Sequence, residues 1–163
     1  MRDWVARHEV AQLPNVVFID SQEYVSSYEL VQRSKFVIVY NSSIGLEAAL
    51  MGKAVLCGGR ARYTQVPTVF FPQTPEALRD QLEEFLNIEQ VPVPAQFQRN
   101  ARRFLYYQLY RTSLPLDDFL EVGPRQGFVQ LKSFPWQALL PQNSPTMRII
   151  TEGILQGKPF LVS

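Results

Sequence analysis

The chain has 163 residues, 46% of them hydrophobic, which suits one domain with a real core. Sixteen basic against fifteen acidic residues leave a net charge of +1, so nucleic acid is not an expected partner. The single cysteine, Cys57, excludes an internal disulfide framework and a cysteine-based zinc site. No apolar stretch approaches the roughly 20 residues of a transmembrane helix, and the N-terminal MRDWVARHEV is too charged for a signal peptide. We therefore expect a soluble, cytoplasmic globular protein.

Short apolar runs alternate with helical patterns between residues 16 and 86. The run FVIVY is continuously apolar, which is typical of a strand covered on both faces. Alternation of strands and helices favours parallel βαβ units. The predicted strands are 16–19, 36–40, 54–57 and 68–71.

The predicted helices of this half have recognisable start and stop signals. Ser26 and Glu29 have the spacing of a capping box. Residues 44–51 look helical, and Gly52 stands where a glycine ends a helix. Thr74-Pro75 supplies an N-cap and a first-turn proline to a helix with an apolar stripe. The stripe consists of Leu78, Leu82, Phe85 and Leu86.

The character of the chain changes after Asn87. Residues 95–112 predict a helix whose arginines we interpret as a solvated face. The prolines between residues 113 and 144 indicate irregular structure, and Ser144-Pro145 begins a final helix that Gly157 ends. The predicted fold is α/β: a Rossmann-like parallel sheet with flanking helices, followed by helical and irregular C-terminal segments. We expect a nucleotide-binding core in 1–90 and an extension, 91–163, packed on the same domain.

A polar break, Asn41-Ser42-Ser43, interrupts the stretch VIVYNSSIGLEAALMGKAVLCGG. If a strand precedes it and a helix follows, the break is a turn at the carboxyl end of a strand, where open α/β sheets bind ligands. Helix N–H groups, two serine hydroxyls and the small Gly45 would suit a phosphate there. Glu47, one turn further on, could accept hydrogen bonds from a ribose diol. These features predict a nucleotide site.

An ordinary structural interpretation stays open from these residues alone. Ser43 could merely cap the helix, Asn41 and Ser42 could be turn residues, and Glu47 could be solvated. The stretch is neither a Walker A motif nor a GxGxxG fingerprint.

The segment YNSSIGLEAALMGKAVLCGGRARY resembles the donor-nucleotide segment of bacterial capsule-polysaccharide glycosyltransferases, the Kdo-transferase-like group of the GT-B fold. It is similar, more distantly, to segments of bacterial sialyltransferases and of UDP-sugar transferases and 2-epimerases. The resemblance implies phosphate binding by Ser42, Ser43 and Gly45, and ribose binding by Glu47. It also implies half of a GT-B fold, in which Asp20 and the turn Ser26–Tyr28 lie near the same cleft. It covers residues 15 to 87 well.

The chain departs from that family in two respects. It has no His-Pro motif, and its one histidine, His8, is followed by Glu9 in a predicted surface helix. A GT-B enzyme also needs an N-terminal acceptor-binding domain, which we expect to be missing from this chain. The leading hypothesis is the nucleotide-sugar-binding half of a glycosyltransferase of capsule or surface-polysaccharide synthesis, inactive alone. The rivals are a non-catalytic α/β module with a vestigial cleft, and a fragment of a nucleotide-sugar 2-epimerase.

The remaining predictions concern ligands and partners. The family implies a CMP- or UDP-sugar donor, no catalytic metal and no other cofactor. Attachment to the inner face of the bacterial membrane would come through partners. Arg60, Arg62 and Tyr63 follow the third strand and are either a loop surface or contacts to phosphate or sugar. Lys53 is expected to complement a helix C-terminus, and Cys57 to lie in the core.

Overall fold

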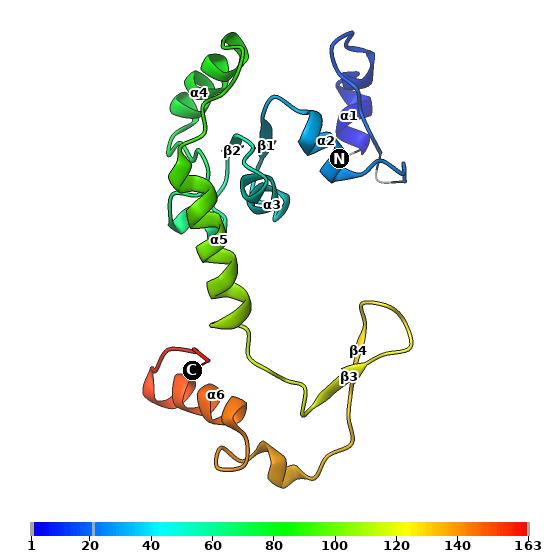
Figure 1. Ribbon diagram of the computed structural model, residues 1–163. Coiled ribbons are helices and arrows are strands. Elements are labelled where there is room, and N and C mark those ends of the chain that lie inside the picture. The colour runs from blue at the N-terminus through cyan, green and yellow to red at the C-terminus, as the bar shows by residue number, and fades with distance from the viewer. Residues whose placement is uncertain (1, 21, 163) are drawn as a thin grey trace. The chain divides into compact units, whose positions relative to one another are not determined.

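The structure is a computed structural model that describes residues 2–20 and 22–162. It consists of two compact units, residues 1–98 and 99–163, and Figure 1 shows their helices and strands. The extents predicted from the sequence, 1–90 and 91–163, stay a prediction. No described helix is long and apolar enough to cross a membrane.

The first unit has a mixed α/β fold built on parallel strands, as predicted. In β1 (Val37–Val39) and β2 (Val55–Cys57) the central partners are Ile38 and Leu56. Phe70 adds a parallel bridge on the other side of β2, where its N–H donates to the Val55 carbonyl at 3.0 Å. The helices of this unit are α1 (Arg2–Arg7), α2 (Ser27–Arg33), α3 (Ile44–Leu50), α4 (Pro75–Asn87) and the start of α5 (Ala95–Tyr110). Short 3-10 helices span Val10–Gln12 and Arg62–Gln65.

Two of the four strand predictions are wrong or only partly right. Residues 16–20 form no strand. The run 68–71 contributes one bridge at Phe70 rather than a strand. The expectation that both faces of the second run are covered is also wrong, because Ile38 is 55% exposed. β2, by contrast, is buried along its whole length, Cys57 included, as expected.

The local helix signals mostly act as predicted. The Thr74 hydroxyl accepts a hydrogen bond from the Ala77 N–H at 3.2 Å and so caps α4. Gly52 ends α3 with a φ of 80°, a left-handed conformation in which a side chain would be strained. Ser26 is the N-cap of α2, but its side chain makes no capping hydrogen bond, so the expected capping box does not form.

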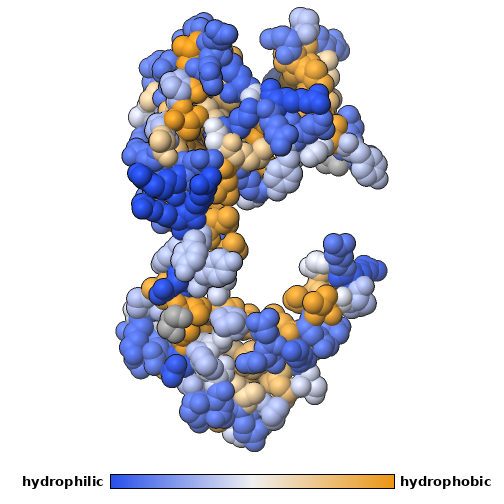
Figure 2. All heavy atoms as spheres, viewed as in Figure 1, coloured by the Kyte–Doolittle hydropathy of each residue, from blue (hydrophilic) through white to orange (hydrophobic). Residues whose placement is uncertain are grey.

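The core of the first unit lies between the sheet and α4. Phe85 is 1% exposed, and its ring packs edge-on against Phe36 and Phe70, with ring centres 5.3 Å and 4.9 Å away. Burial of such a side chain contributes about 1.5–3 kcal/mol. Leu86, predicted in the same stripe, is 61% exposed and lies outside this core. Figure 2 shows hydrophobic residues at the surface among hydrophilic ones.

The second unit contains the rest of α5, a hairpin and α6 (Pro145–Gln156). The strands β3 (Leu120–Val122) and β4 (Val129–Leu131) pair antiparallel, so the prediction of irregular structure over 113–144 is partly wrong. A 3-10 helix spans Trp136–Leu139. The start and end of α6 are as predicted: Ser144 caps it and Gly157 has a φ of 67°.

Candidate functional site

Two loops meet at the carboxyl edge of the sheet. The loop after β1 begins at Tyr40, and the loop after β2 begins at Gly58. The Gly58 N–H donates to the Val39 carbonyl at 2.8 Å, and the Gly59 N–H donates to the Tyr40 carbonyl at 2.6 Å. The parallel pairing therefore continues into both loops and holds them side by side. This is the edge at which open α/β sheets bind ligands.

The predicted turn leaves hydrogen-bonding groups exposed at this edge. Asn41, Ser42 and Ser43 are exposed, and within the described part of the chain their side chains have no hydrogen-bond partner. Ser43 is the N-cap of α3, yet its hydroxyl makes no capping bond. The backbone N–H groups of Ser43 and Ile44 likewise have no acceptor among the described residues. Two hydroxyls, one amide and two N–H groups can thus bind a ligand or water.

A buried tyrosine holds the backbone of this turn through a hydrogen bond. The Tyr63 hydroxyl donates to the Ser42 carbonyl at 2.8 Å, and the side chain is 4% exposed. Burial, followed by the nearby Cys57, raises the pKa of Tyr63 above its usual range, so it stays a donor in ordinary buffers. Sequence reasoning placed Tyr63 on a loop surface or against the ligand. In the structure it is buried, and its hydroxyl bonds the backbone of the turn.

Gly45 is explained by the same tyrosine. A Cβ at this position would overlap the Tyr63 hydroxyl and lie 2.9 Å from the Val39 Cγ2. Gly45 is itself buried, and its N–H donates to the Ser42 carbonyl at 3.1 Å. The space that the sequence suggested for an anion is therefore filled by protein, and Gly45 allows Tyr63 to reach the turn.

Glu47, the predicted ribose ligand, is paired with another residue of the predicted cleft. The Tyr28 hydroxyl, on α2, donates to Glu47 Oε2, on α3, and these two helices are in contact. This hydrogen bond is the main cause that raises the pKa of Tyr28, and the carboxylate charge adds to it. The second oxygen, Oε1, has no hydrogen-bond partner among the described residues. One carboxylate oxygen thus remains for a ligand.

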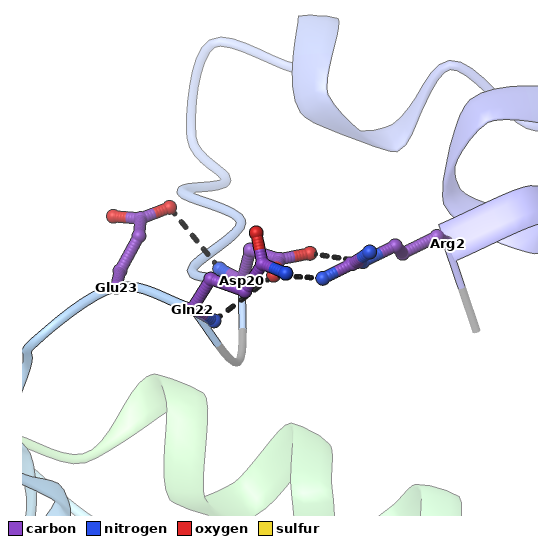
Figure 3. Close-up of polar contacts among 4 residues, drawn as sticks. All are labelled: Arg2, Asp20, Gln22 and Glu23. Carbon is purple, nitrogen blue, oxygen red and sulfur yellow. Dashed lines mark hydrogen bonds and ion pairs between the residues drawn. The ribbon is translucent and has the colours of Figure 1, made fainter.

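Asp20 has different partners. As Figure 3 shows, both of its carboxylate oxygens pair with the guanidinium of Arg2, and Oδ1 also accepts from the Gln22 N–H at 3.0 Å. The Asp20 N–H donates to Glu23 at 3.1 Å. The pairing raises the pKa of Arg2. The contacts drawn for Asp20 therefore join α1 to the loop before α2, not to the Asn41–Ser43 turn.

The two arginines after β2 are exposed to a possible ligand, whereas the Cys57 thiol is buried. Arg60 and Arg62 are exposed and form no ion pair among the described residues. The buried Cys57 thiol lies 3.1 Å from the carbonyl oxygens of Tyr40 and Gly59 and belongs to the core. His8 is exposed just after α1 rather than within it, and its ring lies 4.8 Å from that of Trp4.

Two cavities of the first unit lie at opposite edges of the sheet. One of about 160 Å³ is at the carboxyl edge, between Gly58 and the start of α4 at Thr74. A larger one of about 540 Å³ is at the amino edge and includes Lys35 and Lys53. Their ammonium groups donate to the Leu86 and Ser34 carbonyls, at the ends of α4 and α2. Both cations therefore lie at the negative ends of helices. Lys53 was predicted to complement the helix that it follows, α3, but it lies at the end of α2 instead.

The comparisons with known proteins give a family for the first part of the chain. The family described as "Capsule polysaccharide biosynthesis protein" matches residues 5–92, which include both strands, the polar turn and Glu47. No curated protein and no solved structure matches the chain. The match spans more than half of the 163 residues, and the chain therefore belongs to the capsule polysaccharide biosynthesis protein family.

Proposed function

We propose that the carboxyl edge of this sheet binds the nucleotide-sugar donor of a glycosyltransferase that acts in capsule polysaccharide synthesis. The observation that carries the proposal is the Asn41–Ser43 turn. It is held by Tyr63 while its own side chains have no partner within the described part of the chain. Family membership supports the pathway, and the turn supports the ligand class.

The phosphate is assigned to the turn because of its donors. The Ser42 and Ser43 hydroxyls, with the N–H groups of Ser43 and Ile44, can donate to phosphate oxygens. Arg60 and Arg62 add positive charge on the neighbouring loop and suit the second phosphate of a UDP-sugar. In this proposal these donors stabilise the charge that develops on the leaving phosphate, and no metal takes part.

The ribose is assigned to Glu47. Its unpartnered Oε1 can accept a hydrogen bond from one ribose hydroxyl while Tyr28 keeps Oε2. A second ribose hydroxyl would have to replace Tyr28. The carboxylate also keeps the phosphate at a distance, because like charges repel, so the phosphate stays at the turn.

Binding measurements on the whole chain test this proposal. Titration calorimetry with CMP, UDP, AMP and inorganic phosphate should give dissociation constants between micromolar and millimolar for the pyrimidine nucleotides, roughly −8 to −4 kcal/mol. The double variant Ser42→Ala with Ser43→Ala should bind both the nucleotides and inorganic phosphate more weakly. Glu47→Gln should weaken the binding of nucleotides and leave the affinity for inorganic phosphate unchanged. Glu29→Gln, which changes an exposed carboxylate of α2, is the matched control.

Absence of binding up to millimolar nucleotide would reject the donor site and favour the non-catalytic module. The existing Tyr28–Glu47 hydrogen bond is the observation that favours that second candidate, because it already satisfies one oxygen of the proposed ribose ligand. An unchanged nucleotide affinity in Glu47→Gln would reject the ribose assignment alone.

A further inference from the structure

We propose that Tyr40 is the platform on which the base of the bound nucleotide stacks; this inference rests on the proposed donor site. Tyr40 directly follows β1 and precedes the polar turn. Its side chain is 74% exposed although it lies at the sheet edge where the nucleotide is expected. An exposed aromatic ring beside a phosphate-binding turn has the chemistry that a base requires.

The ring of Tyr40 lies against Gly59. A Cβ built on Gly59 would lie 2.8–2.9 Å from three atoms of this ring, Cδ2, Cε2 and Cζ. Since these three distances are nearly equal, Gly59 lies over the flat face of the ring rather than beside its edge. The missing side chain of Gly59 therefore lets the ring rest on the backbone of the neighbouring loop. One face of the ring is supported in this way, and the high exposure shows that much of the ring remains open to a base.

The backbone of Tyr40 is also held in place. Its carbonyl accepts a hydrogen bond from the Gly59 N–H at 2.6 Å, and the buried Cys57 thiol approaches the same oxygen at 3.1 Å. These contacts fix the point from which the side chain extends. Because the backbone of Tyr40 is held and one face of its ring is supported, the side chain loses little conformational freedom when a ligand stacks on it. A small loss of conformational entropy favours affinity.

The spacing between the platform and the turn suits a nucleotide. Ser43 is three residues after Tyr40, so their Cα atoms are at most about 11 Å apart. A base and its 5′-phosphate are separated by one ribose, which fits within that span. Stacking on an aromatic ring tolerates different bases, because every base has a flat π-face. Tyr40 would thus supply affinity for the base, and selection among bases would fall to other contacts.

The experiment compares ligands with and without a base. Dissociation constants of CMP and ribose 5-phosphate are measured by ligand-observed NMR for the wild type, Tyr40→Phe, Tyr40→Ala and Gly59→Ala. Tyr40→Ala should raise the dissociation constant of CMP by about 5- to 150-fold and leave that of ribose 5-phosphate unchanged. Tyr40→Phe should retain CMP binding, and Gly59→Ala should weaken CMP selectively because its methyl group displaces the ring. Tyr24→Ala, which removes a fully exposed tyrosine, is the control.

The outcomes separate this inference from the proposed function. If the wild type binds neither ligand, both fail. If it binds both ligands and Tyr40→Ala weakens neither, or both equally, the platform is wrong while the donor site stands. Ring-current shifts of the Tyr40 protons on CMP addition to the wild type provide a measurement that needs no variant. Their absence at saturating CMP would also overturn the platform.

Discussion

Replacement of Gly45 by alanine sets two physical effects against each other. Gly45 lies in the first turn of α3, and a helix gains at most about 1 kcal/mol when glycine becomes alanine. The new methyl group, however, would overlap the Tyr63 hydroxyl and press on Val39. Overpacking of a core costs about 1–3 kcal/mol, and loss of the Tyr63–Ser42 hydrogen bond costs about 0.5–1.5 kcal/mol. The net expectation is a destabilisation of roughly 0.5–4.5 kcal/mol.

Urea denaturation of Gly45→Ala, Tyr63→Phe and the double variant checks this reasoning. Tyr63→Phe alone should lose about 0.5–1.5 kcal/mol. Because phenylalanine lacks the oxygen with which the methyl group collides, the double variant should lose less than the sum of the single losses. Stabilisation by Gly45→Ala would show that helix propensity dominates and that the turn is not packed against Tyr63 as described. Strict additivity would refute the direct contact.

Three further predictions concern the first unit. Thr74→Ala should destabilise it by about 1 kcal/mol in urea, because the Ala77 N–H loses its cap. Stability should fall above pH 10, measured by urea denaturation: the folded pKa values of Tyr28 and Tyr63 are raised above 10.0, so their contribution is complete below that pH and is lost as pH rises through the raised values. Tyr63→Phe should flatten this loss. Glu47→Gln should lower the pKa of Tyr28 toward 10.0 in an ultraviolet titration, and an unchanged value would contradict the hydrogen bond between them.

The parts of the fold that were predictable depend on neighbouring residues in the sequence. The start of α4 follows from Thr74-Pro75, and the end of α3 follows from Gly52, because a cap acts within one turn of its helix. The strand expected at 16–19 fails for the opposite reason. Its composition suits a strand, but a strand exists only when another strand pairs with it, and no pairing involves these residues. The composition of a segment shows whether it suits a strand, but not whether another strand pairs with it.

The hairpin of the second unit was missed because its turn signal was interpreted as irregular chain. Gly123 and Gly127 surround Pro124, and the Gly123 N–H donates to the Phe128 carbonyl at 2.8 Å. Gly127 has a φ of 83°, which suits the reversal between β3 and β4. The prolines that suggested irregular structure over 113–144 therefore lie around a hairpin, and two glycines were the informative residues.

For the candidate site, the sequence indicated the turn but not what holds it. Ser42 and Ser43 were recognisable from a strand that breaks before a helix, a local pattern. The Tyr63–Ser42 hydrogen bond joins residues 21 positions apart, and no local pattern encodes it. Gly45 was interpreted as room for an anion, because a small residue indicates that something approaches closely without indicating what. Here the close neighbour is a side chain of the protein itself.

The Tyr28–Glu47 pair sets a condition on any nucleotide that binds this edge. A ligand that takes only Oε1 leaves the link between α2 and α3 intact, whereas one that takes both oxygens must supply a hydrogen bond at least as good as that of Tyr28. A ribose diol has two donors and can satisfy both oxygens, but a deoxyribose has lost one of them. The pair therefore weakens the discrimination between ribonucleotides and deoxyribonucleotides. A deoxyribonucleotide donates its one hydroxyl to Oε1 while Tyr28 keeps Oε2, and the second hydroxyl of a ribonucleotide gains its hydrogen bond only by displacing Tyr28. In Tyr28→Phe the preference for the ribonucleotide should grow, because Oε2 then has no protein donor and only the second hydroxyl of a ribose can satisfy it. Measurement of the affinities for CMP and dCMP in the two proteins tests the condition directly, and an equal preference in both would show that Tyr28 does not compete with the ribose for Glu47.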